Sequence, residues 1–187
     1  AEFVHFYKDV NFLRDLFEKQ YQSSKIKLST GWPKYGYVHP IYGAYADFDL
    51  SGEGSPWLPK RVIDRASGDL EYQRLISKEL DDAMTMTSVF ASLYAKYKVE
   101  DNLDLVWIVL DSGVSNVYPP YDYLSIISNN LNIVDSNESE NDYVRLLNPE
   151  NNPKRQAKWL EPYYDEYRST WMVSIVAPLY DGDQFLG

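Results

Sequence analysis

Apolar residues recur every three or four positions along residues 2–22, which predicts a first helix. The stripe is narrow, as in a coiled-coil seam, and charged residues occupy much of the remaining surface. Two interpretations stay open: a helix packed on its own domain, or a stalk whose seam forms a dimer. The apolar positions are Phe3, Phe6, Val10, Leu13 and Phe17.

A second, longer helix is predicted over residues 69–98, where apolar positions follow the helical period. Asp69 follows Gly68 and has the side chain of a helix N-cap. The expected core stripe consists of Ile76, Leu80, Ala83, Met86 or Thr87, Phe90, Tyr94 and Tyr97.

The most distinct strand signal is a hairpin at residues 105–118. Residues 105–110 are continuously apolar, so we expect a strand that is buried on both faces or central in its sheet. Residues 111–113 (Asp-Ser-Gly) form a turn, and 114–118 form the returning strand, which Pro119 and Pro120 end. Adjacent strands joined by hairpins give an antiparallel sheet, so the predicted fold class is α+β.

Weaker patterns predict the remaining elements. We expect a short strand within residues 35–49, a loop at 51–56, a short turn or helix at 57–64, and short helical segments within 121–133 and 143–147. A strand at 171–177, a tight turn at 180–183 and a second strand at 185–186 follow. That second strand begins where the sequence ends, so we expect the protein to continue.

Composition narrows the classes of partner. The 187 residues suffice for one ordinary domain with a core of its own, or for one domain with a helical extension. The 18 basic and 28 acidic residues give a net charge of −10, which argues against nucleic acid or an anionic membrane surface as a partner. No apolar run approaches the roughly 18–20 residues of a membrane span, so we expect membrane contact only through segments outside this chain. The 17 Tyr and 5 Trp suit a binding surface or an aromatic core equally well.

The sequence contains none of the common catalytic or metal-binding motifs. It lacks cysteine, a Gly-rich phosphate loop, HExxH, GxSxG and EF-hand spacing. His5 and His39 stand in unrelated contexts, which do not make a zinc site. Carboxylate pairs such as Asp181 and Asp183 lie at turns, and nothing places two of them across a sugar as a glycosidase requires. We therefore expect no catalytic residue, no metal and no cofactor.

The aromatic and acidic segment 159–166 is the best candidate binding element. Tyr163, Tyr164 and Tyr167 flank Asp165. Such a group can hold a ligand ammonium through a charged hydrogen bond and cation–π contacts. The alternative is a loop clamp, in which Pro162 fixes the turn and the tyrosines pack on the sheet.

An ordered set of segments carries a resemblance to a known family. The set comprises the two helices, residues 105–113 (LVWIVLDSG) with Tyr118-Pro119, residues 152–155 (NPKR) before Trp159, residues 162–165 (PYYD) and residues 171–181 (WMVSIVAPLYD). It resembles the extracytoplasmic double-Cache sensor domains of bacterial transmembrane receptors, sensor histidine kinases above all. The likeness is strongest from residue 103 onward.

The resemblance implies a PAS-like fold, with a central antiparallel sheet flanked by helices and a long N-terminal helix. Residues 1–30 would form a stalk-like helix and 31–187 the membrane-distal sensor module, ahead of a membrane-proximal module. Amino-acid-binding members carry Arg-x-Trp-Tyr before Tyr-x-Asp; Tyr163 and Asp165 match the second motif, and Arg145 alone matches the first. The residues expected to line the pocket are Tyr163, Asp165, Arg145, Trp107, Tyr118, Trp159 and Trp171.

The function implied is a non-catalytic, ligand-sensing domain on the periplasmic or extracellular side of an inner or plasma membrane receptor. Its ligand would be an amino acid or another small metabolite, with Arg145 facing a carboxylate and Asp165 an amine. Binding would shift the conformation and signal through the N-terminal helix. Two alternatives stay open: a carbohydrate-binding module or glycoside-active enzyme domain that uses the Tyr and Trp side chains, and a protein-interaction domain that forms a homodimer through the first helix.

Overall fold

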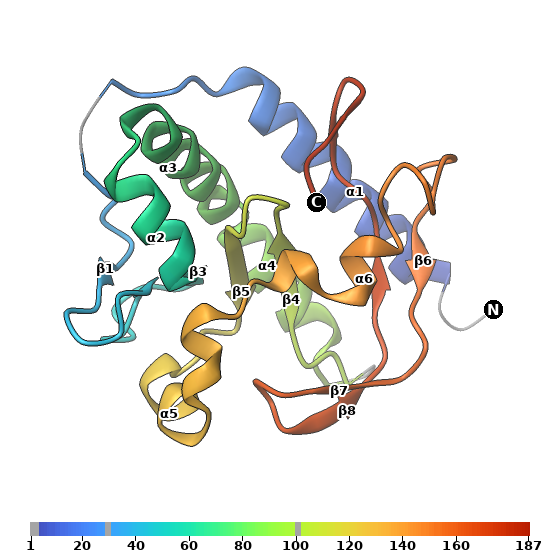
Figure 1. Cartoon of the computed structure of the whole chain (residues 1–187). Coiled ribbons are helices and arrows are strands. Elements are labelled where there is room, and N and C mark those ends of the chain that lie inside the picture. Colours follow the sequence, from blue (N-terminus) through green and yellow to red (C-terminus); the bar gives the residue numbers. More distant parts are fainter. Residues whose placement is uncertain (1–3, 29–30, 100–101) are drawn as a thin grey trace. The chain divides into compact units, whose positions relative to one another are not determined.

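The computed structural model describes residues 4–28, 31–99 and 102–187, which form two compact units (Figure 1). Residues 24–138 form the first, here named the sheet unit. The N-terminal helix and residues 139–187 form the second, here named the hairpin unit. The predicted α+β class is confirmed, since helices and antiparallel strands both occur.

The sheet unit contains one five-stranded antiparallel sheet with the strand order β1-β2-β3-β5-β4. Its strands are β1 (Tyr37–Val38), β2 (Tyr45–Ala46), β3 (Ser55–Leu58), β4 (Val106–Val109) and β5 (Ser115–Tyr118). Its helices are α2 (Lys60–Ser67), α3 (Leu70–Thr85), α4 (Thr87–Tyr97), α5 (Tyr123–Asn129) and the 3-10 helix η1 (Leu131–Asp135). The short 3-10 helix η2 (Glu138–Glu140) follows.

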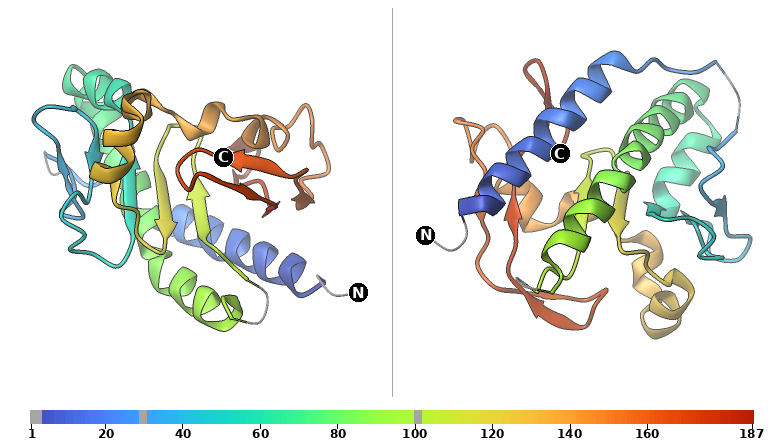
Figure 2. Two further views of the ribbon diagram at one scale, coloured as in Figure 1. Left: turned by 90° about the horizontal axis from the view of Figure 1, so that it is seen from below. Right: turned by 180° about the vertical axis from the view of Figure 1, so that it is seen from behind.

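The predicted hairpin at 105–118 is confirmed as β4 and β5, which lie side by side in both views of Figure 2. The position expected for its first strand is wrong, because β4 is an edge strand of the sheet and its Val106 and Trp107 are half-buried. Trp107 pairs with Val117, and Val109 pairs with Ser115. Gly113 closes the turn at a φ of 96°, a left-handed conformation that glycine adopts without strain. Leu110 and Val114 beside this turn are almost fully buried.

The predicted helix at 69–98 is two helices, α3 and α4, which meet at Met86. Asp69 caps α3 as expected, because its side chain accepts a hydrogen bond from Tyr72 N at 3.0 Å. At the break, Ala83 O accepts Met86 N at 3.2 Å, and Asn116 of β5 bonds residues on both sides. Its Nδ2 donates to Ala83 O and to Thr87 Oγ1, both at 2.9 Å, and so ties the end of α3 and the start of α4 to the sheet.

Two weaker predictions for this unit were incomplete. The single strand expected within 35–49 is the pair β1 and β2. The loop expected at 51–56 is wrong at its end, because β3 begins at Ser55 and continues through Pro56. The Asn116 side chain accepts Ser55 N at 3.0 Å, so this central strand keeps its hydrogen bonding beside a proline.

The hairpin unit consists of α1 and three separate two-stranded ladders. Its elements are α1 (Val4–Ser23), α6 (Asp142–Arg145), β6 (Lys158–Trp159), β7 (Tyr163–Asp165), β8 (Thr170–Met172), β9 (Ile175–Val176), β10 (Tyr180–Asp181) and β11 (Gln184–Phe185). The ladders are β6 with β9, β7 with β8, and β10 with β11.

The first predicted helix is confirmed as α1. Phe17 is buried, whereas Phe6, Val10 and Leu13 are half-buried. Phe3, the first position of the predicted stripe, lies outside the described residues. The assignment of residues 1–30 to a stalk and of 31–187 to one sensor module stays a prediction.

The final hairpin is also confirmed, with Gly182 in its turn at a φ of 60°. β11 pairs with β10, so this strand has its partner within the hairpin. The strand expected at 171–177 is split, because β8 pairs with β7 and β9 pairs with β6. Among the helices of the described ranges, none has the length and apolar character that a bilayer crossing requires.

Candidate functional site

The residues predicted to line a pocket are divided between the two units. Trp107 lies on β4 and Tyr118 on β5 of the sheet unit. The others belong to the hairpin unit: Arg145, Trp159, Tyr163, Asp165 and Trp171. That all seven line one pocket stays a prediction.

Tyr163 is the best-anchored of the predicted residues. Its hydroxyl lies 2.9 Å from Ser174 Oγ, and Ser174 is buried. Its ring packs against Tyr143 of the α6 segment, with centroids 6.2 Å apart. The Tyr163 side chain is therefore held at its hydroxyl by Ser174, which precedes β9, and at its ring by Tyr143.

Asp165 ends β7 and supports the turn that follows. Its Oδ1 accepts a hydrogen bond from Arg168 N at 2.9 Å, and the residue pairs with Thr170 across the ladder. This is the turn-stabilising contact expected of a loop clamp. Its second oxygen, Oδ2, has no hydrogen bond among the described residues, so the half-buried carboxylate can still accept from a ligand.

Arg145 and Trp171 are exposed side chains. Arg145 Nη1 lies 3.7 Å from Asp142 Oδ1, a surface ion pair of little energetic weight. Trp171 is 71% exposed and meets Tyr164 edge-on across the β7–β8 ladder, at 6.0 Å. These two aromatic rings form an exposed patch on the hairpin.

Trp159 joins the ladders to α1. Its ring meets Phe6 at 6.2 Å and Tyr7 at 6.3 Å, both edge-on. It also pairs with Ile175 in the β6–β9 ladder. A second contact to α1 comes from Glu18, which accepts Tyr180 N at 2.8 Å.

A continuous series of contacts therefore links Tyr163 to α1 within the hairpin unit. Tyr163 bonds the Ser174 side chain, and Ser174 O accepts Leu160 N at 2.8 Å. Leu160 follows Trp159, which packs on Phe6. These contacts connect the β7–β8 ladder to the N-terminal helix.

Trp107 and Tyr118 have packing contacts in the sheet unit. The Tyr118 ring meets Tyr94 of α4 edge-on at 5.5 Å. Trp107 faces Val117 in the β4–β5 ladder and is half-buried. Their predicted contact with a ligand stays a prediction.

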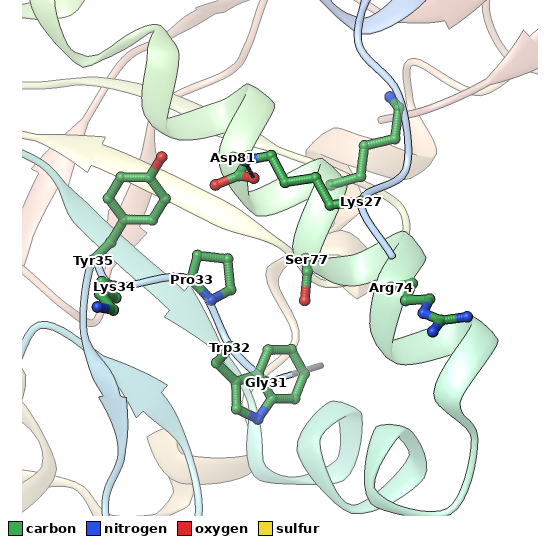
Figure 3. A pocket seen from close by; sticks show the side chains of 10 residues that line it. Lys27, Gly31, Trp32, Pro33, Lys34, Tyr35, Arg74, Ser77 and Asp81 are labelled. Atoms are coloured by element: carbon green, nitrogen blue, oxygen red, sulfur yellow. Dashed lines mark hydrogen bonds and ion pairs between the residues drawn. The ribbon is translucent and has the colours of Figure 1, made fainter. Parts of the chain in front are cut away.

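Sequence reasoning missed a pocket in the sheet unit. It has a volume of about 410 Å³ and lies between α3 and a wall of Lys27 and residues 31–35 (Figure 3). Lys27 Nζ lies 2.7 Å from Asp81 Oδ2 at one side. Burial, together with the charge and hydrogen bond of Asp81, raises the pKa of Tyr35 to about 12, so this phenol stays protonated at neutral pH. No local motif marks this pocket, because its walls come from separate segments.

Neither a metal-binding cluster nor a similar known protein points to a function for the chain. No group of three or more His, Cys, Asp or Glu side chains gathers to hold a metal ion within the part of the chain that the structure describes. No protein-family model, no curated protein and no solved structure matches the chain.

Proposed function

We propose that this chain is the extracytoplasmic small-molecule-sensing domain of a transmembrane signalling receptor, with a two-component histidine kinase as the first choice. The observation that carries the proposal is the series of contacts from Tyr163 through Ser174 and Leu160–Trp159 to Phe6. Together with the double-Cache resemblance, it supports a binding element coupled to the helix that would lead to the membrane.

The proposed ligand is an amino acid or another small metabolite with an ammonium group. Asp165 Oδ2 would accept from the ammonium, and neighbouring tyrosine rings would add cation–π attraction. Asp165 Oδ1 would keep its bond to Arg168 N, so the turn would survive ligand release. Arg145 would meet a ligand carboxylate when the exposed side chain leaves Asp142.

The proposed signal is a population shift rather than a chemical step. A ligand that binds one arrangement of the β7–β8 hairpin more tightly favours that arrangement in proportion to the difference in affinity. Ser174 and Trp159 would pass the bias to α1. The five-stranded sheet would correspond to the PAS-like sheet of the sensor family, and α1 would also form the homodimer seam of the full receptor.

The experiment is a thermal-shift screen of the purified chain against free amino acids, small amines and carboxylates. We expect stabilisation by one class of ammonium-bearing metabolite, because ligand that binds only the native state raises its stability by mass action. Calorimetry then compares Asp165→Asn, which keeps an acceptor for Arg168 N, with the neighbouring exposed Glu166→Gln. Asp165→Asn should weaken binding at least tenfold, and Glu166→Gln should leave it unchanged. Equal affinity for both variants would remove Asp165 from the site.

A carbohydrate-binding module is the second candidate, favoured by the exposed pair Tyr164 and Trp171. Flat, exposed aromatic faces suit the apolar face of a sugar ring. In the same screen, stabilisation by oligosaccharides that Trp171→Ala abolishes would support this candidate over the sensor. Turnover of a glycoside would instead indicate an enzyme.

A further inference from the structure

We propose that the pocket between α3 and residues 31–35, with Lys27, is a second binding site, for a small carboxylate with a flat aromatic or apolar body. The site lies wholly within the sheet unit and does not rest on the function proposed for Tyr163. Its volume of about 410 Å³ falls within the range of small-molecule sites, roughly 300–1,000 Å³. The lining residues that carry the argument are Trp32, Lys34, Tyr35, Arg74 and Ser77.

The charge of the pocket identifies the class of ligand. Four cationic side chains line it, although the whole chain carries a net charge of −10: Lys27, Lys34, Arg74 and Lys78. Two of these charges are compensated, since Lys27 pairs with Asp81 at 2.7 Å and Lys78 pairs with Asp82 at 2.8 Å. Lys34 and Arg74 have no acidic partner among the described residues, so the pocket has an excess of positive charge that suits an anion.

Hydrogen-bond donors in the pocket are also left for a ligand. Arg74 Nε and Ser77 Oγ are buried and have no hydrogen-bond partner in the described part of the chain. Arg74 donates from Nη2 to Leu28 O at 3.2 Å, which fixes the guanidinium while its Nε stays unused. Buried donors without acceptors are costly, and a carboxylate that enters here satisfies them.

The aromatic wall gives the site its second requirement. Figure 3 shows Trp32 and Pro33 opposite Ser77 of α3, with Tyr35 and Asp81 at one side. Trp32 is half-buried and held by a tilted contact to Tyr45 at 6.0 Å, so its ring offers a positioned flat surface. A ring stacked there would place an attached carboxylate near Ser77 of α3, whose hydroxyl points toward Trp32 in Figure 3.

The test is a calorimetric titration of the whole chain with benzoate, with benzamide and benzylamine as neutral and cationic isosteres. We expect benzoate to bind, benzamide to bind at least tenfold more weakly and benzylamine not to bind. The double variant Lys34→Gln with Arg74→Gln should weaken benzoate binding at least tenfold. Arg61→Gln, an exposed charge change on α2 outside the pocket, should leave it unchanged.

Ser77→Ala is a second variant that tests the same site without changing a charge, in case the charge variants fold poorly. The Ser77 hydroxyl has no partner among the described residues, so its removal should leave the melting temperature unchanged or raised while it lowers benzoate affinity several-fold. Absence of benzoate binding, equal binding of benzylamine, or equal loss in Arg61→Gln would overturn the proposal. None of these outcomes bears on Tyr163 or Asp165, so failure here and failure of the sensing function are distinguishable.

Discussion

The two units of this chain stabilise their strands in different ways. The sheet unit has one five-stranded sheet with β3 fully buried, whereas the hairpin unit divides its six strands among three ladders. Among the described residues, the largest side chains that are less than 2% exposed lie almost all in the sheet unit. Phe17 is the one that belongs to the hairpin unit. The strands of one sheet bury their side chains in a common core, whereas each separate two-stranded ladder is stabilised by the contacts in its own neighbourhood. The hairpin unit is therefore better suited to adapt to a ligand, and the sheet unit to hold a preformed pocket.

The largest expected contrast comes from one tryptophan in each unit. Trp57 is fully buried, stacks on Tyr123 at 4.6 Å and donates from Nε1 to Ser136 O at 3.3 Å. Trp57→Ala should lower the free energy of unfolding by about 3–5 kcal/mol, because it leaves a cavity. Trp171→Ala, at an exposed position, should change it by under about 0.5 kcal/mol. Urea denaturation measures both, and similar losses would contradict the contrast between the units.

A second large effect is expected at Asn116, the buried polar centre of the sheet unit. Its side chain bonds Ser55 N, Ala83 O and Thr87 Oγ1. Asn116→Ala should destabilise the chain by about 2–3 kcal/mol, since buried polar groups lose their partners. The exposed Asn132→Ala serves as control in the same denaturation experiment. A loss no greater than in the control would mean that Asn116 does not organise the junction of α3 and α4.

In the hairpin unit the corresponding contact is weaker and more local. Tyr163→Phe removes the hydroxyl that bonds Ser174 Oγ and should lower the free energy of unfolding by about 0.5–1.5 kcal/mol. Ser174→Ala and the double variant complete a thermodynamic cycle, with a coupling energy of about 0.5–1 kcal/mol expected for a real bond. Strict additivity of the two substitutions would remove the first link from Tyr163 to α1.

The smallest effect is a pH dependence at Glu18. Burial raises the pKa of Glu18 above its ordinary 4.5, against the opposing hydrogen bond from Tyr180 N and the charge of Arg14. A raised carboxyl pKa means that the folded state binds more protons, so this contribution is full below pH 4.5 and is lost as pH rises through the folded pKa. Glu18→Gln keeps an acceptor for Tyr180 N and avoids that loss.

The Glu18→Gln variant should thus match the parent at pH 4 and exceed its stability at pH 7. The gain should stay under about 0.5 kcal/mol, because solvent screens this partly exposed carboxylate. Thermal melts at several pH values measure the difference. A variant less stable than the parent at pH 7 alone would show that the charged form of Glu18 stabilises α1.

The sequence predicts elements well where one local signal decides them. The helix periodicity, the Asp69 cap and the turns at Gly113 and Gly182 all depend on residues close in the chain, and all are confirmed. The helix break at Met86 was not predicted, and Asn116, which bonds both sides of the break, is distant in sequence. β3 was missed for a related reason: Pro56 argues against a central strand, and the Asn116 side chain that accommodates it lies on β5.

The two candidate sites differ in the same respect: one is formed by residues that are contiguous in the sequence, and the other by residues from separate segments. The Tyr163–Asp165 element was predicted because its tyrosines and carboxylate are contiguous, although it is a strand and turn rather than a loop. The pocket at α3 gave no sequence signal. In the sequence, Lys34 and Arg74 look like ordinary surface charges, and only the fold brings residues 31–35 together with α3 around one pocket.

The most direct test of the proposed sensing function is hydrogen–deuterium exchange of the whole chain, with and without the metabolite selected by the thermal-shift screen. We expect slower exchange in residues 158–176 together with 4–23, because the contact series joins Tyr163 to α1. Tyr163→Phe should reduce the protection of α1 more than that of the β7–β8 hairpin. Protection confined to residues 24–138, or to the hairpin with α1 unchanged, would contradict the account.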